Sequence, residues 1–277
     1  TEAATVFPTG FAANLGVLAT FADSKTLVVS DELNHASIID GCRLARADVA
    51  IARHGDPEHV DELLKRASGR RAIVVTDAVF SMDGDLAPLN ELAEVCTRNG
   101  ALLVVDEAHS VISPAVEYGE AEVLRVGTLS KTLGALGGFV AGPRAAVDLI
   151  VNRSRAYIFT TAPTPADMAA ALAALKIVRS QEGDALREIL RSRVRQLQPE
   201  IKSPASPIIP IRFGTEQATL GAAAALLKQG FLVPAIRPPT VPVGTSRLRI
   251  ALSATHSAEQ VDALARAFGQ SDGDLGV

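Results

Sequence analysis

Short apolar runs alternate along the first half of the chain with longer stretches in which apolar residues recur at helical spacing. The short runs are rich in β-branched residues and predict strands at residues 26–30, 49–53, 72–76, 102–106, 123–128 and 137–141. The longer stretches predict helices at residues 11–20, 36–45, 58–67, 89–98 and 144–153. Continuous runs such as Leu102-Leu103-Val104-Val105 indicate strands that are buried on both faces. This alternation predicts βαβ units and an α/β fold with a mostly parallel sheet.

The pattern changes after Pro163 and predicts a smaller α+β domain. We expect helices at residues 166–178, 182–197 and 217–228 and from 258 onward, and strands at residues 208–213, 231–235 and 247–252. The pair Ser257 and Gln260 has the spacing of a capping box for the last helix. The sequence therefore predicts a large domain over residues 1–180 and a small C-terminal domain over 181–277, with 270–277 as a frayed end.

Composition narrows the class of protein. The 277 residues are 48% apolar, enough for a large core, and carry a net charge of −4. This balance argues against a nucleic-acid partner, which usually meets a basic face. No apolar run reaches the length of a membrane span, so we expect no membrane association. The isolated cysteines Cys42 and Cys96 are typical of a reduced interior, and the expectation is a cytoplasmic protein.

Asp106 is the first candidate for chemistry. It ends the predicted strand 102–106, and His109 follows three residues later. Ligands of parallel sheets bind beyond the carboxyl ends of the strands, so a carboxylate there is well placed for a site. The same residue could equally cap the turn that follows its strand. The sequence of this segment leaves both interpretations open.

Lys131 is the second candidate. It lies among small and hydroxyl residues directly after a predicted strand, in Gly127-Thr128-Leu129-Ser130-Lys131-Thr132-Leu133-Gly134. Hydroxyls and backbone N–H groups can hold a phosphate, and a lysine amine can form a Schiff base. The glycine spacing does not fit a P-loop. Taken alone, the segment could also be a loop with a solvated lysine.

Together the two segments match the needs of pyridoxal 5′-phosphate (PLP). That cofactor needs a lysine for its imine, a carboxylate at its pyridine nitrogen and donors for its phosphate. Asp106 and Lys131 could supply the first two from neighbouring turns of the sheet. Thr128, Ser130 and the turn at Gly10 could hold the phosphate.

Nearly the whole chain resembles the α-oxoamine synthases, which are PLP enzymes of fold type I. The matching runs, in chain order, are Thr9-Gly10-Phe11-Ala12-Ala13-Asn14, Asn34-His35-Ala36-Ser37, Val79-Phe80-Ser81-Met82-Asp83-Gly84-Asp85, Asp106-Glu107-Ala108-His109, Thr128-Leu129-Ser130-Lys131 and Ile236-Arg237-Pro238-Pro239-Thr240-Val241-Pro242. The resemblance implies the aminotransferase-like fold of this family, with helices on both faces of the large sheet and a smaller C-terminal domain.

The resemblance also implies roles for single residues. Lys131 would carry the cofactor as a Schiff base, Asp106 would pair with the ring nitrogen, and His109 would bond the ring oxygen. His35 would stack on the ring and contact substrate. Further cofactor contacts are implied for Gly10, Phe11, Ser81, Thr128, Thr160 and Thr161. The two adjacent threonines resemble a pair that reaches the phosphate across the interface of a homodimer with shared active sites. Substrate contacts are implied for Thr240, Arg249 and Arg237.

Several of these residues have a simpler interpretation. His35 could be a histidine at a helix start with a satisfied ring, and Ser81 could be an ordinary turn residue. Arg237 and Arg249 could be surface charges on an edge strand. The other histidines lack metal-ligand spacing, so we expect no metal site.

The proline-rich segment 236–242 indicates the substrates within the family. It is similar to members that condense L-alanine with pimeloyl-CoA, or a pimeloyl-carrier thioester, in biotin synthesis. The products would be an amino-oxononanoate, CO2 and free thiol. The alternatives are another α-oxoamine synthase that uses glycine or a different thioester, a different PLP reaction such as amino transfer, and a non-catalytic PLP-binding subunit.

The sequence departs from the family in three places. Nothing precedes Thr9 that matches the N-terminal segment of family members. The stretch from Ser110 to Lys131 lacks the usual glycine-rich loop, and the junction near residues 198–203 is short. Our expectation is that segments near 110–122 and 198–203 are missing from the sequence.

Overall fold

The computed structural model describes residues 1–66 and 69–269, which divide into two compact units. The first unit contains residues 1–80, 86–110 and 114–178. The second contains residues 81–85, 111–113 and 179 onward. The frayed end expected at 270–277 and the last residue of the helix expected at 58–67 lie outside the described residues.

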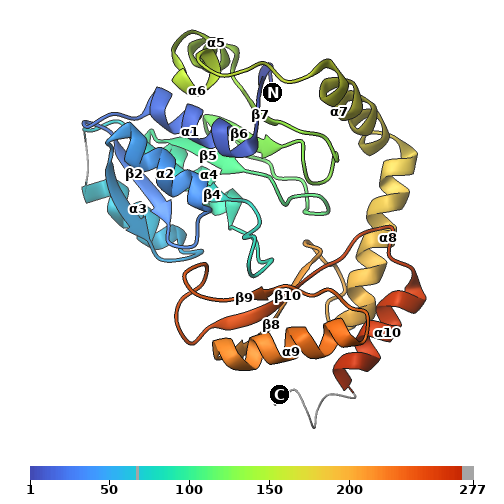
Figure 1. The fold of residues 1–277 in the computed structure, drawn as a ribbon. Coiled ribbons are helices and arrows are strands. Elements are labelled where there is room, and N and C mark those ends of the chain that lie inside the picture. Colours follow the sequence, from blue (N-terminus) through green and yellow to red (C-terminus); the bar gives the residue numbers. More distant parts are fainter. Residues whose placement is uncertain (67–68, 270–277) are drawn as a thin grey trace. The chain divides into compact units, whose positions relative to one another are not determined.

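A seven-stranded sheet forms the centre of the first unit (Figure 1). Its spatial order is β1-β7-β6-β5-β4-β2-β3, and the strands are β1 (Ala3–Phe7), β2 (Leu27–Asp31), β3 (Asp48–Ala52), β4 (Ala72–Asp77), β5 (Leu102–Asp106), β6 (Val123–Thr128) and β7 (Gly138–Gly142). Five neighbouring strands are parallel to one another, namely β6, β5, β4, β2 and β3. By contrast, β7 is antiparallel to β6, and β1 is antiparallel to β7. The predicted α/β fold with a mostly parallel sheet is confirmed.

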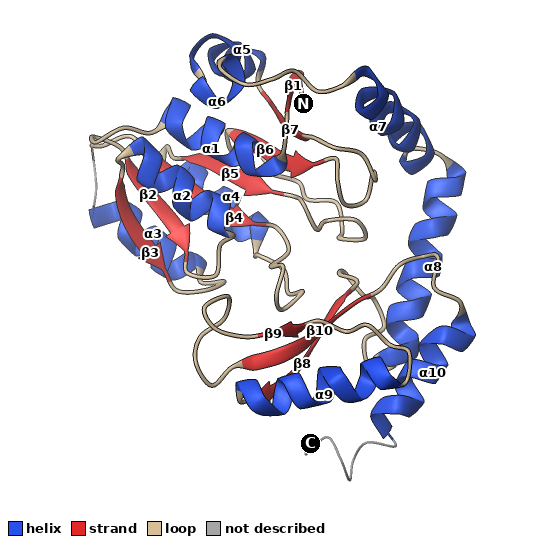
Figure 2. Cartoon of the chain, in the orientation of Figure 1, coloured by secondary structure: helices blue, strands red, loops and turns tan. Residues whose placement is uncertain are grey.

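Helices cover both faces of this sheet, as Figure 2 shows. The helices of the first unit are α1 (Gly10–Phe21), α2 (Ala36–Ala45), α3 (Pro57–Arg66), α4 (Leu89–Asn99), α5 (Arg144–Arg153), α6 (Arg155–Ile158) and α7 (Pro165–Val178). One core cluster joins α3 and α4 to the sheet, and the other joins α1, α2 and α5 to the opposite face. Successive strand residues alternate between the clusters: Val74 packs in the first, Ile73 and Val75 in the second. The predicted burial of both strand faces is therefore confirmed.

The start of α1 fits tightly against β7. Thr9 caps the helix, and its hydroxyl accepts a hydrogen bond from the N–H of Ala12 at 3.0 Å. A Cβ at Gly138 would meet the backbone of Thr9 and Gly10 at 2.5 Å. Glycine at this position therefore lets the helix N-terminus approach the sheet.

The described residues of the second unit form a three-stranded antiparallel sheet and three helices. The strands are β8 (Ile208–Gly214), β9 (Ala235–Ile236) and β10 (Ser246–Ala251), and the helices are α8 (Gln181–Leu197), α9 (Glu216–Lys228) and α10 (Ala258–Gly269). The capping box is confirmed, since the N–H of Ser257 donates to Gln260 Oε1 at 2.9 Å and the N–H of Gln260 donates to Ser257 Oγ at 3.2 Å.

The predicted strand at residues 231–235 is wrong in most of its length, because only Ala235 of that range lies in β9. Pro234 has no N–H and cannot donate to a strand ladder, which limits pairing there. The sequence interpretation also omitted two short elements. Strand β1 and the single-turn helix α6 were not predicted.

The tight contact at Gly138 gives a stability prediction. Gly138→Ala should lower the free energy of unfolding by about 1–3 kcal/mol. The added methyl group would clash with backbone atoms, which cannot move away as a flexible side chain could. Chemical denaturation followed by circular dichroism measures the change.

Gly221→Ala is the matched control. Gly221 lies in α9, and nothing lies within 4 Å of its would-be Cβ. This alanine should raise helix stability by about 0.5–1 kcal/mol. Equal stability of Gly138→Ala and the original protein would contradict the proposed close approach.

Candidate active site

Two buried carboxylates lie side by side at the carboxyl edge of the parallel strands. Asp77 ends β4 and Asp106 ends β5, and the two residues are paired in the register of these strands. They are only 4% and 6% exposed. Burial raises the pKa of the Asp77 carboxyl well above its ordinary value of 3.8, and the neighbouring charge of Asp106 acts in the same direction.

Hydrogen bonds to both oxygens hold the Asp106 carboxylate. The side-chain amide of Asn14, on α1, donates to Oδ2 at 2.6 Å. The backbone N–H of Ala108 donates to Oδ1 at 2.9 Å. Asp106 thus supports the turn after its strand, as one interpretation expected, and it also lies at the strand end where parallel sheets bind ligands.

Lys131 and His109 form a contact between the turns that follow β6 and β5. Lys131 Nζ lies 2.9 Å from His109 Nε2. The charge of Lys131 partly offsets the rise that burial causes in the pKa of Asp77. The same charge adds to the fall that burial causes in the pKa of His35. The charge of Lys131 therefore acts at the sheet edge where Asp77 and His35 lie.

His35 is held at the first turn of α2. It is the N-cap residue of that helix, and its ring Nδ1 accepts from the N–H of Ser37 at 3.2 Å. Its own backbone N–H donates to Asp77 Oδ2 at 2.8 Å. Burial lowers the pKa of the His35 ring and outweighs the opposing charge of Asp106, which keeps the ring uncharged near neutral pH.

Hydroxyl groups gather at the end of β6, beside the start of α1. Thr128 Oγ1 and Ser130 Oγ are 2.8 Å apart. A Cβ at Gly10, the first residue of α1, would lie 3.1 Å from Thr128 Cβ. The first N–H groups of a helix point outward and attract anions, so this corner combines hydroxyl and N–H donors.

The remaining predicted residues lie in other places. Ser81 belongs to the second unit, where its carbonyl accepts from Arg249 Nε. Arg237 is half exposed and lies 3.7 Å from a carboxylate oxygen of Glu216. Three exposed threonines complete the set, with Thr240 after β9 and Thr160 and Thr161 between α6 and α7.

Sequence reasoning gave no role to three residues of this site, namely Asn14, Ser37 and Asp77. Asp77 could have been found, because it ends a buried strand as Asp106 does. Asn14 and Ser37 lie in motifs that were recognised, and both are only 1% exposed. A polar residue in a predicted buried helix face is the signal that points to them.

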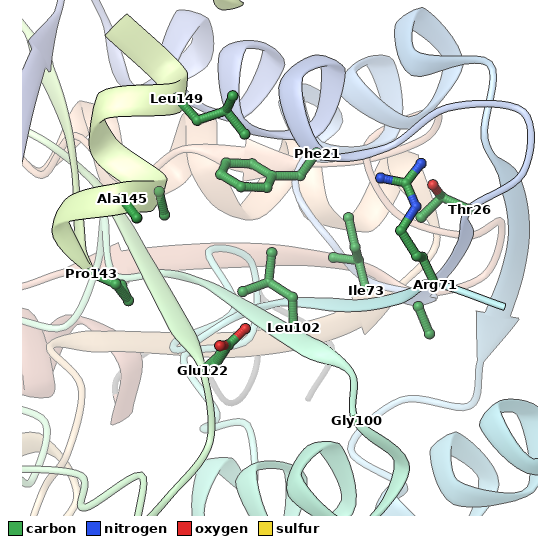
Figure 3. Close-up of a pocket in the computed structure, with 12 residues that line it drawn as sticks. Phe21, Thr26, Arg71, Ile73, Gly100, Leu102, Glu122, Pro143, Ala145 and Leu149 are labelled. Atoms are coloured by element: carbon green, nitrogen blue, oxygen red, sulfur yellow. The ribbon is translucent and has the colours of Figure 1, made fainter. Parts of the chain in front are cut away.

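A cavity of about 430 Å³ lies at the opposite edge of the sheet (Figure 3). Phe21, Ile73, Leu102 and Leu149 line it, together with the charged Arg71 and Glu122. None of the candidate residues described above lines this cavity. Over the described ranges, the structure has no helix long and apolar enough to cross a bilayer, and no group of three potential metal ligands.

Comparison with known proteins identifies the class. Residues 1–268 match the family described as aminotransferase class I and II. The chain belongs to this family.

Curated relatives narrow the assignment. The chain is 49% identical to the 8-amino-7-oxononanoate synthase of Anaeromyxobacter dehalogenans, over 99% of its own length and 72% of that protein. It is 45% identical to the protein of the same name from Marinobacter nauticus, over 98% of its length and 72% of that protein.

Solved structures agree with these relatives. A serine palmitoyltransferase from S. paucimobilis with a bound PLP–myriocin aldimine has a TM-score of 0.93 and 31% identity, covering 100% of this chain and 74% of that one. The 8-amino-7-oxononanoate synthase of Francisella tularensis has a TM-score of 0.79 and 25% identity, covering 97% and 82%. The resemblance that the motifs indicated, and the PLP-dependent aminotransferase-like fold that it implied, are confirmed.

The buried carboxyl of Asp77 predicts a pH dependence. Its folded-state pKa exceeds the unfolded value, so its contribution to stability is complete below about pH 4 and is lost as the pH rises through the folded pKa. Asp77→Asn removes this loss and keeps an oxygen for the N–H of His35. The cofactor-free variant should therefore be more stable than the original protein at pH 8, with the advantage disappearing towards pH 4.

Urea denaturation at several pH values measures the difference. Asp40→Asn, on the exposed side of α2, is the control for the loss of a carboxyl group from the protein surface. If the free energy of unfolding changed with pH in the same way for Asp77→Asn and the original protein, the burial of the Asp77 carboxyl would not be what lowers stability at high pH.

Proposed function

We propose that this chain catalyses the PLP-dependent decarboxylative condensation of L-alanine with a pimeloyl thioester. The products are 8-amino-7-oxononanoate, CO2 and the free thiol, as in biotin synthesis. The observation that carries the proposal is the convergence of Asp106, His109 and Lys131 at one edge of the sheet, in a chain whose curated relatives bear the name of this synthase.

The residues at this edge fit PLP. Asp106 is a buried carboxylate that two donors hold in place, as a partner for a protonated ring nitrogen requires. Lys131 has the amine to which the cofactor aldehyde would bond. The hydroxyls of Thr128 and Ser130 and the N–H groups of Gly10 and Phe11 form a donor set suited to the phosphate.

When bound, PLP supplies an electron-poor ring that accepts the electron pair left on the substrate α-carbon when a bond to that carbon breaks. Asp106 would hold the proton on the ring nitrogen, because a buried carboxylate favours a positive partner. Its position between the amide of Asn14 and the N–H of Ala108 prevents it from turning away.

Lys131 moves the proton at the substrate α-carbon. Its amine would act as the base that takes up and returns this proton, and the amine must be neutral for that role. His109, whose Nε2 lies 2.9 Å from Nζ, fixes the position of the amine and would bond the ring oxygen. The ring of His35 would stack on the cofactor and keep water from it, and the lowered pKa of this imidazole favours its uncharged form.

Arg249 would bind the carboxylate of alanine. Its guanidinium is half buried, and burial lowers its pKa. Within the described residues no carboxylate forms an ion pair with it, while its Nε donates to the carbonyl of Ser81. A desolvated guanidinium with this arrangement favours a small anionic ligand. As the family resemblance implies, Ser81 would contact the cofactor, Thr240 would contact the acyl substrate, and Arg237 would contact a substrate.

We also propose that the chain acts as a homodimer. The exposed apolar side chains Phe159, Leu172 and Leu175 lie on and beside α7, and Phe159 is 72% exposed. Exposed apolar side chains that form a patch on one segment favour contact with another protein chain. Thr160 and Thr161, in the same region, would reach the phosphate of the partner subunit.

The direct test is a turnover assay of the full chain loaded with PLP. L-Alanine and pimeloyl-CoA should give 8-amino-7-oxononanoate, detected by mass spectrometry, and free thiol in equal amount. Glycine and L-serine in place of alanine are the comparisons. Equal or faster thiol release with either of them would assign a different member of the α-oxoamine synthases.

Lys131→Ala tests the assignment of the base. Turnover should fall at least about 100-fold, since a positioned general base contributes that much or more to the rate. The visible absorbance band of the lysine-bound cofactor should also be lost. Lys228→Ala, on α9, is the control and should retain both. Full activity of Lys131→Ala would refute the role of this lysine.

A further inference from the structure

Asn14 is a polar residue in the apolar face of α1. It is 1% exposed and lies beside Ala13, Val17 and Leu18, which all pack in the core beneath the helix. Asparagine is a poor helix former, and burial of its amide is unfavourable unless the amide is bonded. A leucine of similar size would be more stable in this apolar environment. The asparagine is therefore explained by the hydrogen bonds of its amide.

The two N–H groups of the Asn14 amide are both used. Nδ2 donates to Asp106 Oδ2 at 2.6 Å and to Ser37 Oγ at 2.8 Å. The amide thus joins the end of β5 to the first turn of α2, two elements far apart in the sequence.

The orientation of this amide follows from its neighbours. Its Oδ1 is buried and has no hydrogen-bond partner within the described part of the chain. Turning the amide over would place Oδ1 against the carboxylate of Asp106 and bring two acceptors together. The two N–H donors of Asn14 are therefore satisfied, while its oxygen is buried without a donor, which is unfavourable.

Ser37 extends the connection to His35. Its hydroxyl oxygen accepts from Asn14 and lies 2.7 Å from His35 Nδ1. The N–H of Ser37 also points at Nδ1, at 3.2 Å. Nδ1 is therefore an acceptor, and the neutral His35 ring carries its proton on Nε2.

We propose that Asn14 is a positioning residue that fixes Asp106 and His35 as one unit through Ser37. The roles of Asp106 and His35 toward PLP rest on the proposed function, whereas the hydrogen-bond chain is independent of it. Asn14 itself would not touch the reacting atoms. It acts by orienting the carboxylate that pairs with the ring nitrogen and the imidazole that lies on the ring.

The test measures the dissociation constant of PLP for the cofactor-free full chain by absorbance titration. Asn14→Leu should weaken PLP binding roughly 10- to 100-fold, the value of a lost hydrogen bond to a charged group. Asn14→Asp, of the same shape, replaces the donor with an acceptor facing Asp106 and should weaken binding at least as much. Ser37→Ala breaks only the outer link and should have a smaller effect.

A double-mutant cycle separates positioning from a general structural role. In the Asp106→Asn background, Asn14→Leu should cause no further loss of PLP affinity, because the bond through which it acts is already altered. A merely structural Asn14 would cause the same loss in both backgrounds. Asn99→Asp is the matched control, since Asn99 also donates to an aspartate, Asp61, at 2.8 Å and should leave PLP binding unchanged.

Unchanged PLP affinity and absorbance in Asn14→Leu would overturn the proposal, as would equal losses in both backgrounds. If circular dichroism shows that neither Asn14→Leu nor Asn14→Asp folds, Asn14 is structural and the proposal is likewise overturned. The two proposals fail separately. A chain that binds PLP without condensing alanine and pimeloyl-CoA refutes only the proposed reaction, and normal binding by Asn14→Leu refutes only this inference.

Discussion

The burial of two carboxyl groups at the ends of adjacent strands is the constraint that the first unit must satisfy. Asp77 and Asp106 are neighbours across β4 and β5 and are almost completely removed from water. A buried carboxylate is very unfavourable unless donors or positive charges surround it. The site consists largely of the groups that meet this need, namely the amide of Asn14, the N–H groups of Ala108 and His35, and the charge of Lys131.

The packing of helices α1 and α2 against the sheet positions two of these donors beside the carboxylates. Helix α1 contributes Asn14 from its first turns, and α2 contributes His35 at its N-cap. Both helices lie on the same core cluster against one face of the sheet. A shift of either helix would break bonds to the carboxylates, so the apolar core and the polar site stabilise the same arrangement. Close contact between Gly138 and the start of α1 is part of this arrangement.

In the second unit, the carboxylate of Asp83 is likewise stabilised by groups that donate hydrogen bonds to it. This carboxylate accepts from Arg212 at 2.9 Å and also from Arg247, whose side chain is almost fully buried. Arg249 lies on the same strand as Arg247 and is bonded to the carbonyl of Ser81. The segment 81–85 therefore packs as part of the second unit, although the residues on either side of it belong to the first. Arg249 is thus held by its bond to the carbonyl of Ser81, next to a segment that the ion pairs of Asp83 fix in place.

The sequence by itself determined six of the seven strands of the large sheet, the α/β class and several candidate residues, among them Asp106 and Lys131. These depend on local patterns: buried strands such as β5 read as continuous apolar runs, and Asp106 and Lys131 follow directly from strand ends. It missed β1, because a five-residue edge strand next to a terminus has little pattern of its own and is defined by pairing with β7. It misplaced the strand before Arg237, because β9 pairs with β10 through only two residues.

Only the tertiary structure decided which polar groups meet. Asn14 and Asp106 are separated by 92 positions, and His35 and Asp77 by 42. No periodicity links such residues, because side-chain spacing along a helix or strand describes one element at a time. The sequence therefore identified Asp106 and His35 as separate candidates, and the folded chain showed that the amide of Asn14 and the hydroxyl of Ser37 connect them.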